Sequence, residues 1–463
     1  MTSARVWAAS RFETAHLPDA RLNRRLVKVE TMLAAKSLDS INQASEDWAE
    51  AKAAYRFIEN ESVKPDDLIQ PIADSTARDC AGAPAIFAVH DTTEMGLKSA
   101  RGAQGLGPVG DDPNARGMYC HVTLAVRENG IVVGLLHQYN WRLDPDDTEK
   151  SCDRKKRPIE EKESVKWLKG IRGAHEALER NLPPEQRPRL IHVGDRENDI
   201  PEAFRDIVAL DDSAVIRSSQ SRRVELEDGS GALSHEAVRA APLLGTATLE
   251  VPRKRGRAAR MARVQIRSCA VQVIPRRERH PNCERIALNL VEVWEPKAPQ
   301  GDEPLHWILW TLEPCATLAQ AMRVVDIYKL RWRIEDFNLV LKEGCRVEEL
   351  QFETAERLEK VVILYGPVAV RILQLRDYAR MHPEAPCTVV LCDTEWKALW
   401  TRIHREPPKR GTGPPTIQQA TLWIGRLGGH LGRKSDGMPG VRTLWRGWRD
   451  LNLLATMYCI LAP

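Results

Sequence analysis

Residues 84–91, PAIFAVHD, form an apolar run rich in β-branched residues that ends in an acid, and residues 190–195, LIHVGD, repeat this pattern. Such runs are typical of buried strands. Two more strand-like runs, HVTLAVRENG at 121–130 and IVVGLLHQY at 131–139, lie between them. A helical pattern over 158–180 precedes the second acid-ended run. The predicted order is therefore β-β-β-α-β.

The chain after this unit continues the same alternation. We predict a helix over 201–210, a strand over 214–217 and one long helix over about 318–342. This order is the one expected of an α/β fold with an RNase H-like core. Between them, about residues 218–317, polar turns separate the strand-like runs TATLEV, ARVQIRS, RIALNLVEVW and HWILWTL. We interpret this segment as a β-rich insertion into the core.

Helical segments flank the core on both sides. We predict an N-terminal helical domain over 1–70, the RNase H-like core over 71–370 and a C-terminal helical domain over 371–463. The tail is rich in tryptophan, with Trp423, Trp445 and Trp448. Aromatic residues at helical spacing are usually core residues, which is the interpretation we favour over a binding platform.

The composition is that of a folded protein in a reducing compartment. The chain has 463 residues, with Lys+Arg 68 and Asp+Glu 64, a formal net charge of +4. A length of this order predicts several domains. The ten cysteines contain no C-x-x-C pair, which argues against a zinc ribbon. The most apolar stretch, 361–370, is about half a membrane span. We expect a cytoplasmic, nucleoid-associated bacterial protein with no membrane partner.

Three acids are placed where this core would bring them together. Asp91 is expected just past the first strand, Asp195 just past the fourth, and Glu335 on the late helix. An acid after a strand is more often a turn former or an N-cap than a catalyst. Three converging carboxylates, however, repel one another unless a divalent cation neutralises them, and oxygen ligands are what Mg²⁺ prefers. The set predicts metal-assisted phosphoryl transfer.

The late helix adds cationic and hydroxyl groups near Glu335. Tyr328, Arg331, Glu335 and Lys342 recur at spacings of three, four and seven, so they share one helical face. Arginine holds phosphate bidentately and lysine supplies a point charge. A salt-bridged surface helix is the alternative, but it does not explain the tyrosine. The stripe therefore indicates a DNA strand beside a metal site.

Basic residues also cluster in two other places. Arg21, Arg24, Arg25 and Lys28 recur at helical spacing in DARLNRRLVKVE, and 253–267 carries seven basic residues and no acid. Most cationic helix faces are simply solvated, and a basic run can be a disordered loop. Beside an acidic metal site, both would suit phosphate binding.

The segment YKLRWRIEDFNLVLKEG, with Tyr328, Arg331, Glu335 and Lys342, resembles the Y-R-E-K signature of the insertion-sequence-four family of DDE transposases. The similarity spans nearly the whole chain. It includes AAYRFIEN at 53–60, HDTTEMG around Asp91, GLLHQYNWRLDPDD at 134–147, HVGDREND around Asp195, LAQAMRVVDIYKLRWRIEDF at 318–337 and IGRLGGHLGRK at 424–434.

The resemblance implies roles for these residues. Asp91, Asp195 and Glu335 would be the DDE metal ligands for two Mg²⁺ ions, with Mn²⁺ expected to substitute, and Tyr328, Arg331 and Lys342 would hold phosphates near the cleaved end. Arg217 is also assigned to DNA binding. The resemblance further implies a cut-and-paste transposase that binds inverted-repeat ends, forms a hairpin on the transposon end, joins the excised element to target DNA and acts as a synaptic homodimer. It implies that 1–70 is the DNA end-recognition domain, 71–370 the catalytic core and 371–463 the dimerisation domain.

Trp307 is the remaining DNA-binding candidate. Strand alternation over 305–313 places Trp307 and Trp310 on opposite faces. The family resemblance implies that Trp307, 28 residues before Glu335 (335 − 307), receives a base that leaves the stack during hairpin formation. The alternative is that Trp307 is part of the insertion core, because strand tryptophans usually pack.

Two other functions compete with the transposase interpretation. A structure-selective nuclease on the same core would cut DNA without joining it, so strand-transfer products would discriminate. An inactive DNA-binding regulator of transposition would tolerate loss of the acidic triad, yet all three acids are present.

Overall fold

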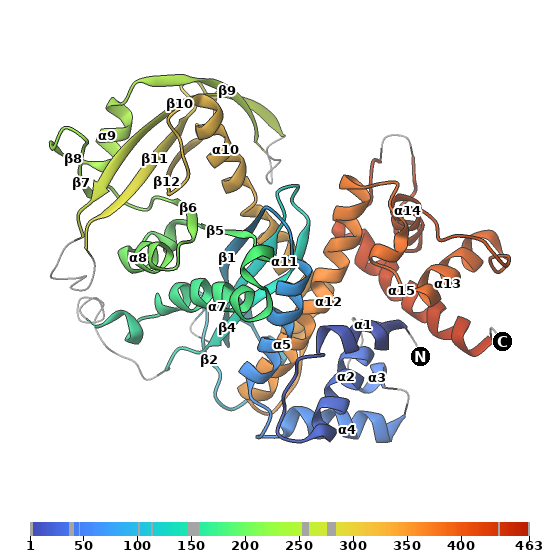
Figure 1. Cartoon of the computed structure of the whole chain (residues 1–463). Coiled ribbons are helices and arrows are strands. Elements are labelled where there is room, and N and C mark those ends of the chain that lie inside the picture. Colours follow the sequence, from blue (N-terminus) through green and yellow to red (C-terminus); the bar gives the residue numbers. More distant parts are fainter. Residues whose placement is uncertain are drawn as a thin grey trace.

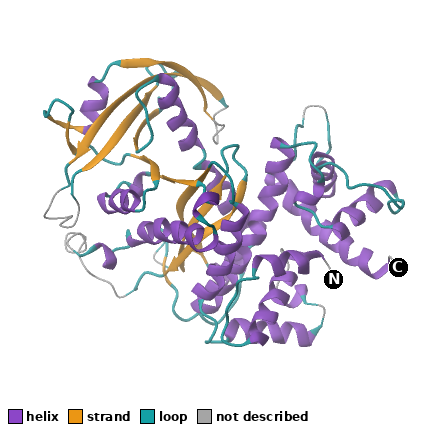
Figure 2. Ribbon diagram, viewed as in Figure 1, coloured by secondary structure: helices purple, strands orange, loops and turns teal. Residues whose placement is uncertain are grey.

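The computed structural model describes residues 3–36, 41–45, 47–100, 102–112, 114–145, 157–251, 259–275, 284–433 and 436–461. Figure 1 shows a central strand-rich body with helices at both ends of the chain, and Figure 2 shows the same division by secondary structure. Within the described residues, no helix is both long enough and apolar enough to cross a membrane.

The first five helices are amphipathic and pack through their apolar faces. They are α1 (Ser3–Arg11), α2 (Ala20–Ala35), α3 (Ile41–Ala44), α4 (Trp48–Glu59) and α5 (Pro65–Asp79). Asp19 caps α2 by accepting a hydrogen bond from the Arg21 amide, and Asp47 caps α4 by accepting one from the Glu50 amide. The predicted domain limit at residue 70 falls inside α5.

The core sheet has the strand order of an RNase H-like fold. Its strands are β1 (Ala85–Gly96), β2 (Gly107–Pro108), β3 (Arg116–Val126), β4 (Val132–Trp141), β5 (Arg189–Gly194) and β6 (Ser213–Arg217). β4, β3 and β1 pair antiparallel, while β1, β5 and β6 pair parallel. The parallel crossovers pass through α7 (Val165–Asn181) and α8 (Pro201–Ala209). This confirms the predicted fold class.

The two faces of the core sheet are covered by different helices. Ile86 and Ala88 of β1 pack in one apolar cluster with α5 and α7. Phe87 and Val89 belong to the cluster that contains α10 (Leu318–Lys329), α11 (Trp332–Leu339) and α12 (Ala355–Met381). This alternation follows from the pleat of a strand. Even-numbered β1 residues therefore face α7, and odd-numbered ones face the late helices.

The insertion continues the same sheet. It contains β7 (Arg223–Glu225), β8 (Gly231–Leu233), α9 (Ser234–Ala240), β9 (Leu243–Val251), β10 (Arg260–Val273), β11 (Ile286–Trp294) and β12 (His306–Thr311). β12 pairs antiparallel with β6, with Leu309 opposite Arg217, so core and insertion form one twelve-stranded sheet. The expected β-rich character is confirmed. Residues 252–258, which include four of the seven basic residues of the run over 253–267, lie outside the described residues. The other three, Arg260, Arg263 and Arg267, lie in β10.

The single late helix predicted over 318–342 is wrong. The structure has α10 (Leu318–Lys329), α11 (Trp332–Leu339) and a π-helical turn, η5 (Val340–Gly344). The Leu330 and Arg331 amides bond to carbonyls three residues back, on Ile327 and Tyr328, which tightens the backbone and ends α10. No proline or glycine marks this break, so it could not be predicted from the residue pattern.

The C-terminal helices are α12 (Ala355–Met381), α13 (Asp393–His404), α14 (Ile417–Leu427) and α15 (Val441–Leu461). The predicted limit between 370 and 371 falls inside α12. Trp445 and Trp448 of α15 are buried against the core cluster, which confirms that they are core residues. Their burial within one chain means that these two rings are not a contact surface for a second copy.

Candidate active site

Asp91 and Asp195 lie at the same level on neighbouring parallel strands. The pairing of β1 with β5 runs from Ala85 opposite Arg189 to Val89 opposite Val193, an offset of 104 (189 − 85). Asp91 and Asp195 have the same offset (195 − 91), so they stand side by side just beyond the last paired residues. Asp91 is inside β1 rather than past its end, because β1 continues to Gly96 along β3.

Glu335 approaches these aspartates from α11. The Arg331 guanidinium links the two elements: its Nη1 is 3.3 Å from Glu335 Oε1 and 3.9 Å from Asp91 Oδ2. The Arg331 side chain is mostly buried, whereas half of Glu335 is open to solvent. A cation thus bridges the two carboxylates, as expected where like charges are gathered.

The pKa of Asp91 responds to both other acids. Burial, together with the Glu335 and Asp195 carboxylates, raises the pKa of Asp91 to about 7 against the opposing charge of Arg331. Burial also raises the pKa of Asp195, opposed by the hydrogen bond from the Glu197 amide. Asp91 is therefore half protonated near neutral pH.

The carboxylates form a donor set for a metal but not a closed cage. Within the described part of the chain, no three His, Cys, Asp or Glu side chains lie close enough to enclose one ion. Three carboxylates from β1, the end of β5 and α11 are nevertheless the oxygen donors that suit a hard divalent cation. Their mutual repulsion, seen in the pKa of Asp91, is what such a cation would relieve. The residues present fit the group.

Three predicted DNA-binding residues lie together beside the acids: Tyr328, Arg217 and Trp307. The guanidinium of Arg217, at the end of β6, donates to the His306 carbonyl and lies near the Tyr328 hydroxyl. Burial raises the pKa of Tyr328, and the charge of Arg217 opposes this shift. The Trp307 ring lies edge-on to Tyr328, with centroids 5.2 Å apart. Tyr328 is only 3% exposed, so its hydroxyl faces Arg217 and not open solvent.

The two tryptophans of β12 point to opposite faces, as predicted. Trp310 is fully buried against Phe204, whereas Trp307 is half-buried and contacts Tyr328. Lys342 is separated from the other three by the breaks in the helix. It lies in η5, donates to the Glu94 carbonyl of β1 and pairs with Glu348 at 3.6 Å. It still borders the strand that carries Asp91.

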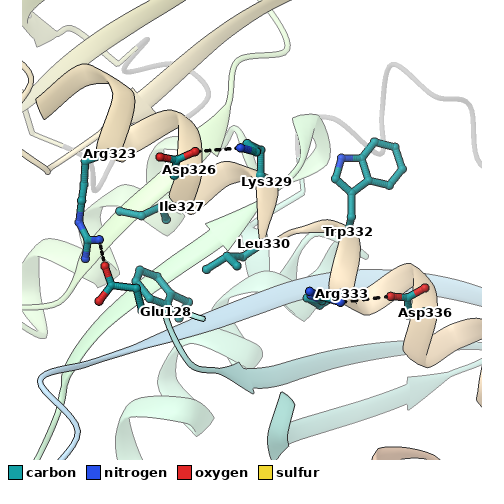
Figure 3. A pocket seen from close by; sticks show the side chains of 10 residues that line it. Glu128, Arg323, Asp326, Ile327, Lys329, Leu330, Trp332, Arg333 and Asp336 are labelled. Carbon is teal, nitrogen blue, oxygen red and sulfur yellow. Dashed lines mark hydrogen bonds and ion pairs between the residues drawn. The ribbon is translucent and has the colours of Figure 1, made fainter. Parts of the chain in front are cut away.

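A pocket of about 550 Å³ borders the turn between α10 and α11, and the sequence did not indicate it. Figure 3 shows that its charged side chains pair among themselves: Arg323 with Glu128, Lys329 with Asp326 and Arg333 with Asp336. These internal pairs leave little net charge, so the pocket does not extend the acidic site. Trp332, which lines it, stacks beneath the Arg331 guanidinium at 4.6 Å.

The basic residues predicted near the N-terminus lie on α2. Arg21, Arg24 and Lys28 are exposed and Arg25 is half-exposed, and Arg21 pairs with Asp19 at 2.7 Å. The sequence interpretation missed a second stripe on α4, where Trp48, Lys52 and Arg56 are all exposed. Their spacing of four residues is a helical signal that could have found it.

Three family models match the chain. They are "Transposase DNA-binding" over residues 4–63, "Transposase DDE domain" over 212–365 and "Transposase Tn5 dimerisation domain" over 367–458. Glu335 lies within the DDE match, whereas Asp91 and Asp195 precede it.

Among solved structures, the chain is similar to a piggyBac transposase in a synaptic complex with hairpin DNA, at a TM-score of 0.33 and 9% identity over 100% of this chain and 74% of that one. A likeness of this size carries no argument about the fold or the site. The family matches, together with the α/β core and the clustered acids, are sufficient: this chain is a DDE transposase.

Proposed function

We propose that this transposase excises a DNA element at inverted-repeat ends and joins its 3′ ends to target DNA, and that it belongs to the insertion-sequence-four family, near the transposase of transposon five. The observation that supports the chemistry most directly is the shared level of Asp91 and Asp195, with Glu335 tied to Asp91 through Arg331. Asp91, Asp195 and Glu335 would hold two Mg²⁺ ions. When bound, such ions activate the attacking oxygen and stabilise the leaving one.

The cationic and hydroxyl groups around the acids would position DNA. Arg331 neutralises Asp91 and Glu335, and a phosphate oxygen is an equally suitable partner for its guanidinium. The Arg217 guanidinium lies near the Tyr328 hydroxyl, so one phosphate could bind both. Lys342 adds a charge on the other side of Asp91, next to Glu94. The four groups would fix the scissile phosphate relative to the carboxylates.

Trp307 is well placed for a role in hairpin formation. It is half-buried at the margin of the site, with its ring against Tyr328. A hairpin forces a tight bend, and a base near the cut must leave the stack at a cost of a few kcal/mol unless an aromatic surface receives it. Trp307 would be that surface.

Two helical surfaces would bring ends together. The exposed cations of α2 and α4 would contact the phosphates of the terminal repeat. On α15, Leu453, Met457 and Ile460 are exposed at spacings of four and three, which makes an apolar stripe on one helix face. This stripe, not the buried tryptophans, would make the twofold contact of a homodimer.

The test is Asp195→Asn in the purified protein. We expect loss of Mg²⁺-dependent nicking with end binding nearly intact, because affinity comes mainly from basic contacts to phosphates. Denaturing gels, which resolve the products formed on a cognate end over time, measure the nicking rate. A mobility shift measures the affinity for the end. Nicking at a rate close to wild type would refute the assignment.

The two competing functions separate in the same assay. A structure-selective nuclease would cut without strand-transfer products, and an inactive regulator would bind ends without cutting. The clustered acids favour the transposase over the regulator, because a regulator has no use for two carboxylates, Asp195 and Glu335, that raise the pKa of a third, Asp91.

A further inference from the structure

A chain of side-chain hydrogen bonds crosses the sheet directly behind the catalytic aspartates. His90 of β1 and His192 of β5 face α7, the side opposite to Asp91, and both are fully buried. His90 Nε2 lies 2.9 Å from His192 Nδ1. Thr123 Oγ1 of β3 lies 3.0 Å from His90 Nδ1, and His192 Nε2 lies 3.2 Å from Asp212 Oδ2. Three strands are thereby linked.

One assignment of tautomers fits every bond in this series. The Asp212 carboxylate can only accept, so His192 donates from Nε2, and with a neutral ring its Nδ1 accepts. In this assignment His90 donates from Nε2 to that Nδ1, and His90 Nδ1 accepts from the Thr123 hydroxyl. His175 Nδ1, 2.9 Å from Asp212 Oδ2, donates to the same oxygen. One tautomer of each buried ring satisfies the whole chain.

These hydrogen bonds matter because of where they lie relative to the two aspartates. The pairing of β1 with β5 ends at Val89 and Val193, two residues before Asp91 and Asp195. His192 lies opposite Ala88 within this pairing and His90 is one residue beyond Val89, so their hydrogen bond runs diagonally across the end of the paired segment, just before the two acids. Asp91 and Asp195 raise the energy of each other's charged form, which favours their separation.

The α7 helix packs closely against these hydrogen-bonded side chains. A Cβ on Gly170 of α7 would lie 2.9 Å from both His90 Nδ1 and Thr123 Oγ1, so only glycine lets α7 pack here. Glycine inside a helix costs about 0.5–1 kcal/mol relative to alanine. Gly170 lowers the stability of α7 but lets the helix enclose His90 and Thr123. This close packing supports a specific arrangement of the rings.

We propose that His90 and His192 are positioning residues that hold Asp91 and Asp195 at one level for divalent-cation binding. This rests on the proposed metal site. The rings touch neither DNA nor the ions; they act through the strands that carry the carboxylates.

The test is calorimetric titration of Mn²⁺ into the full-length protein without DNA, with melting curves for each variant. His192→Ala should weaken Mn²⁺ binding about tenfold, the lower range seen when outer-shell partners of a metal site are removed. His192→Gln, whose amide can donate to Asp212 and accept from His90, should restore most of the affinity. Thr123→Val keeps the volume, removes the first donor and should weaken binding about threefold.

His137→Ala is the matched control. His137 of β4 also packs beneath α7, against Gly173, but it is not part of the series of hydrogen bonds that contains His90 and His192. If His192→Ala and His137→Ala lower the melting temperature equally while both keep the wild-type Mn²⁺ affinity, then His192, like His137, only stabilises the fold. This result would overturn the proposal. If His192→Ala does not fold, unchanged affinity in Thr123→Val overturns it. A wild-type protein that binds no Mn²⁺ would instead refute the metal site itself.

Discussion

The sheet and the helical ends build their functional surfaces in different ways. In the sheet, Asp91, Asp195 and Glu335 come from three distant segments and influence one another. On α2 and α15, each surface comes from one helix, whose exposed residues contribute side by side. A site whose parts act as a unit fails when one part is lost, whereas a row of separate contacts weakens by steps. Substitutions should therefore be all-or-none in the sheet and graded on the helices.

The largest effect is expected at Glu335. Glu335→Gln should lower the nicking rate about 1,000-fold or more, and combining it with Asp195→Asn should add little, because the three carboxylates work as one set. Single-turnover nicking of a labelled end gives both rates. If the two losses multiplied, the acids would be acting separately, and the contrast with the helices would disappear.

The apolar stripe of α15 comes next. Leu453→Glu with Met457→Glu should weaken the end-bound dimer about 30-fold or more, as expected for the loss of central apolar contacts of about 2 kcal/mol. Analytical ultracentrifugation with a single-end DNA measures it. Both side chains are exposed, so the melting temperature should not change; Trp448→Ala, in the core, should lower it. A full-strength dimer would place the twofold contact elsewhere.

Trp307 lies at the seam between sheet and helix, where β12 meets α10. As the base receiver, Trp307→Ala should slow hairpin formation about tenfold relative to first-strand nicking, since only the later step needs distorted DNA. Time courses of nicked, hairpin and blunt products give the ratio. Equal loss of both steps, with a lower melting temperature, would make Trp307 a core residue.

On α2, Arg24→Ala and Lys28→Ala should each weaken end binding about fivefold and lower the salt slope of log K by about 1, and the double variant should show the product. Mobility shifts at several salt concentrations measure this, with nicking of saturated complexes as the control. A change in the nicking rate at saturation would contradict the separation of binding from chemistry.

The smallest effect concerns the charge of Asp91. Its pKa is raised from 3.8 to about 7, so the folded state binds the proton more tightly than the unfolded chain, and this stabilisation, present at low pH, is lost as pH rises through about 7. Asp91→Asn should therefore melt about 2 °C above wild type at pH 8 without metal, and the gap should shrink toward pH 5. A gap independent of pH would mean that the carboxylate is not destabilised in the site.

The sequence predicted the sheet better than the late helices. Asp91 and Asp195 were found because buried parallel strands leave a clear apolar run with the acid at its end. The break at Leu330–Arg331 was missed because tertiary packing ends α10 there without a proline or glycine. The hydrogen bond between His90 and His192 also lies beyond a one-dimensional pattern, because it depends on which strands become neighbours. The α4 stripe, by contrast, was readable from its spacing alone.

The separation of the catalytic acids along the chain sets an order of events during synthesis. Asp91 and Glu335 are 244 residues apart (335 − 91). At about 5–20 residues per second, about 12–50 s pass between their syntheses. The helices with the basic surface, residues 3–59, emerge before either acid. Under the proposed assignments, a nascent chain therefore carries the basic surface of α2 and α4 well before it can hold a metal. It cannot cut a strand until α11, which supplies Glu335, has been synthesised.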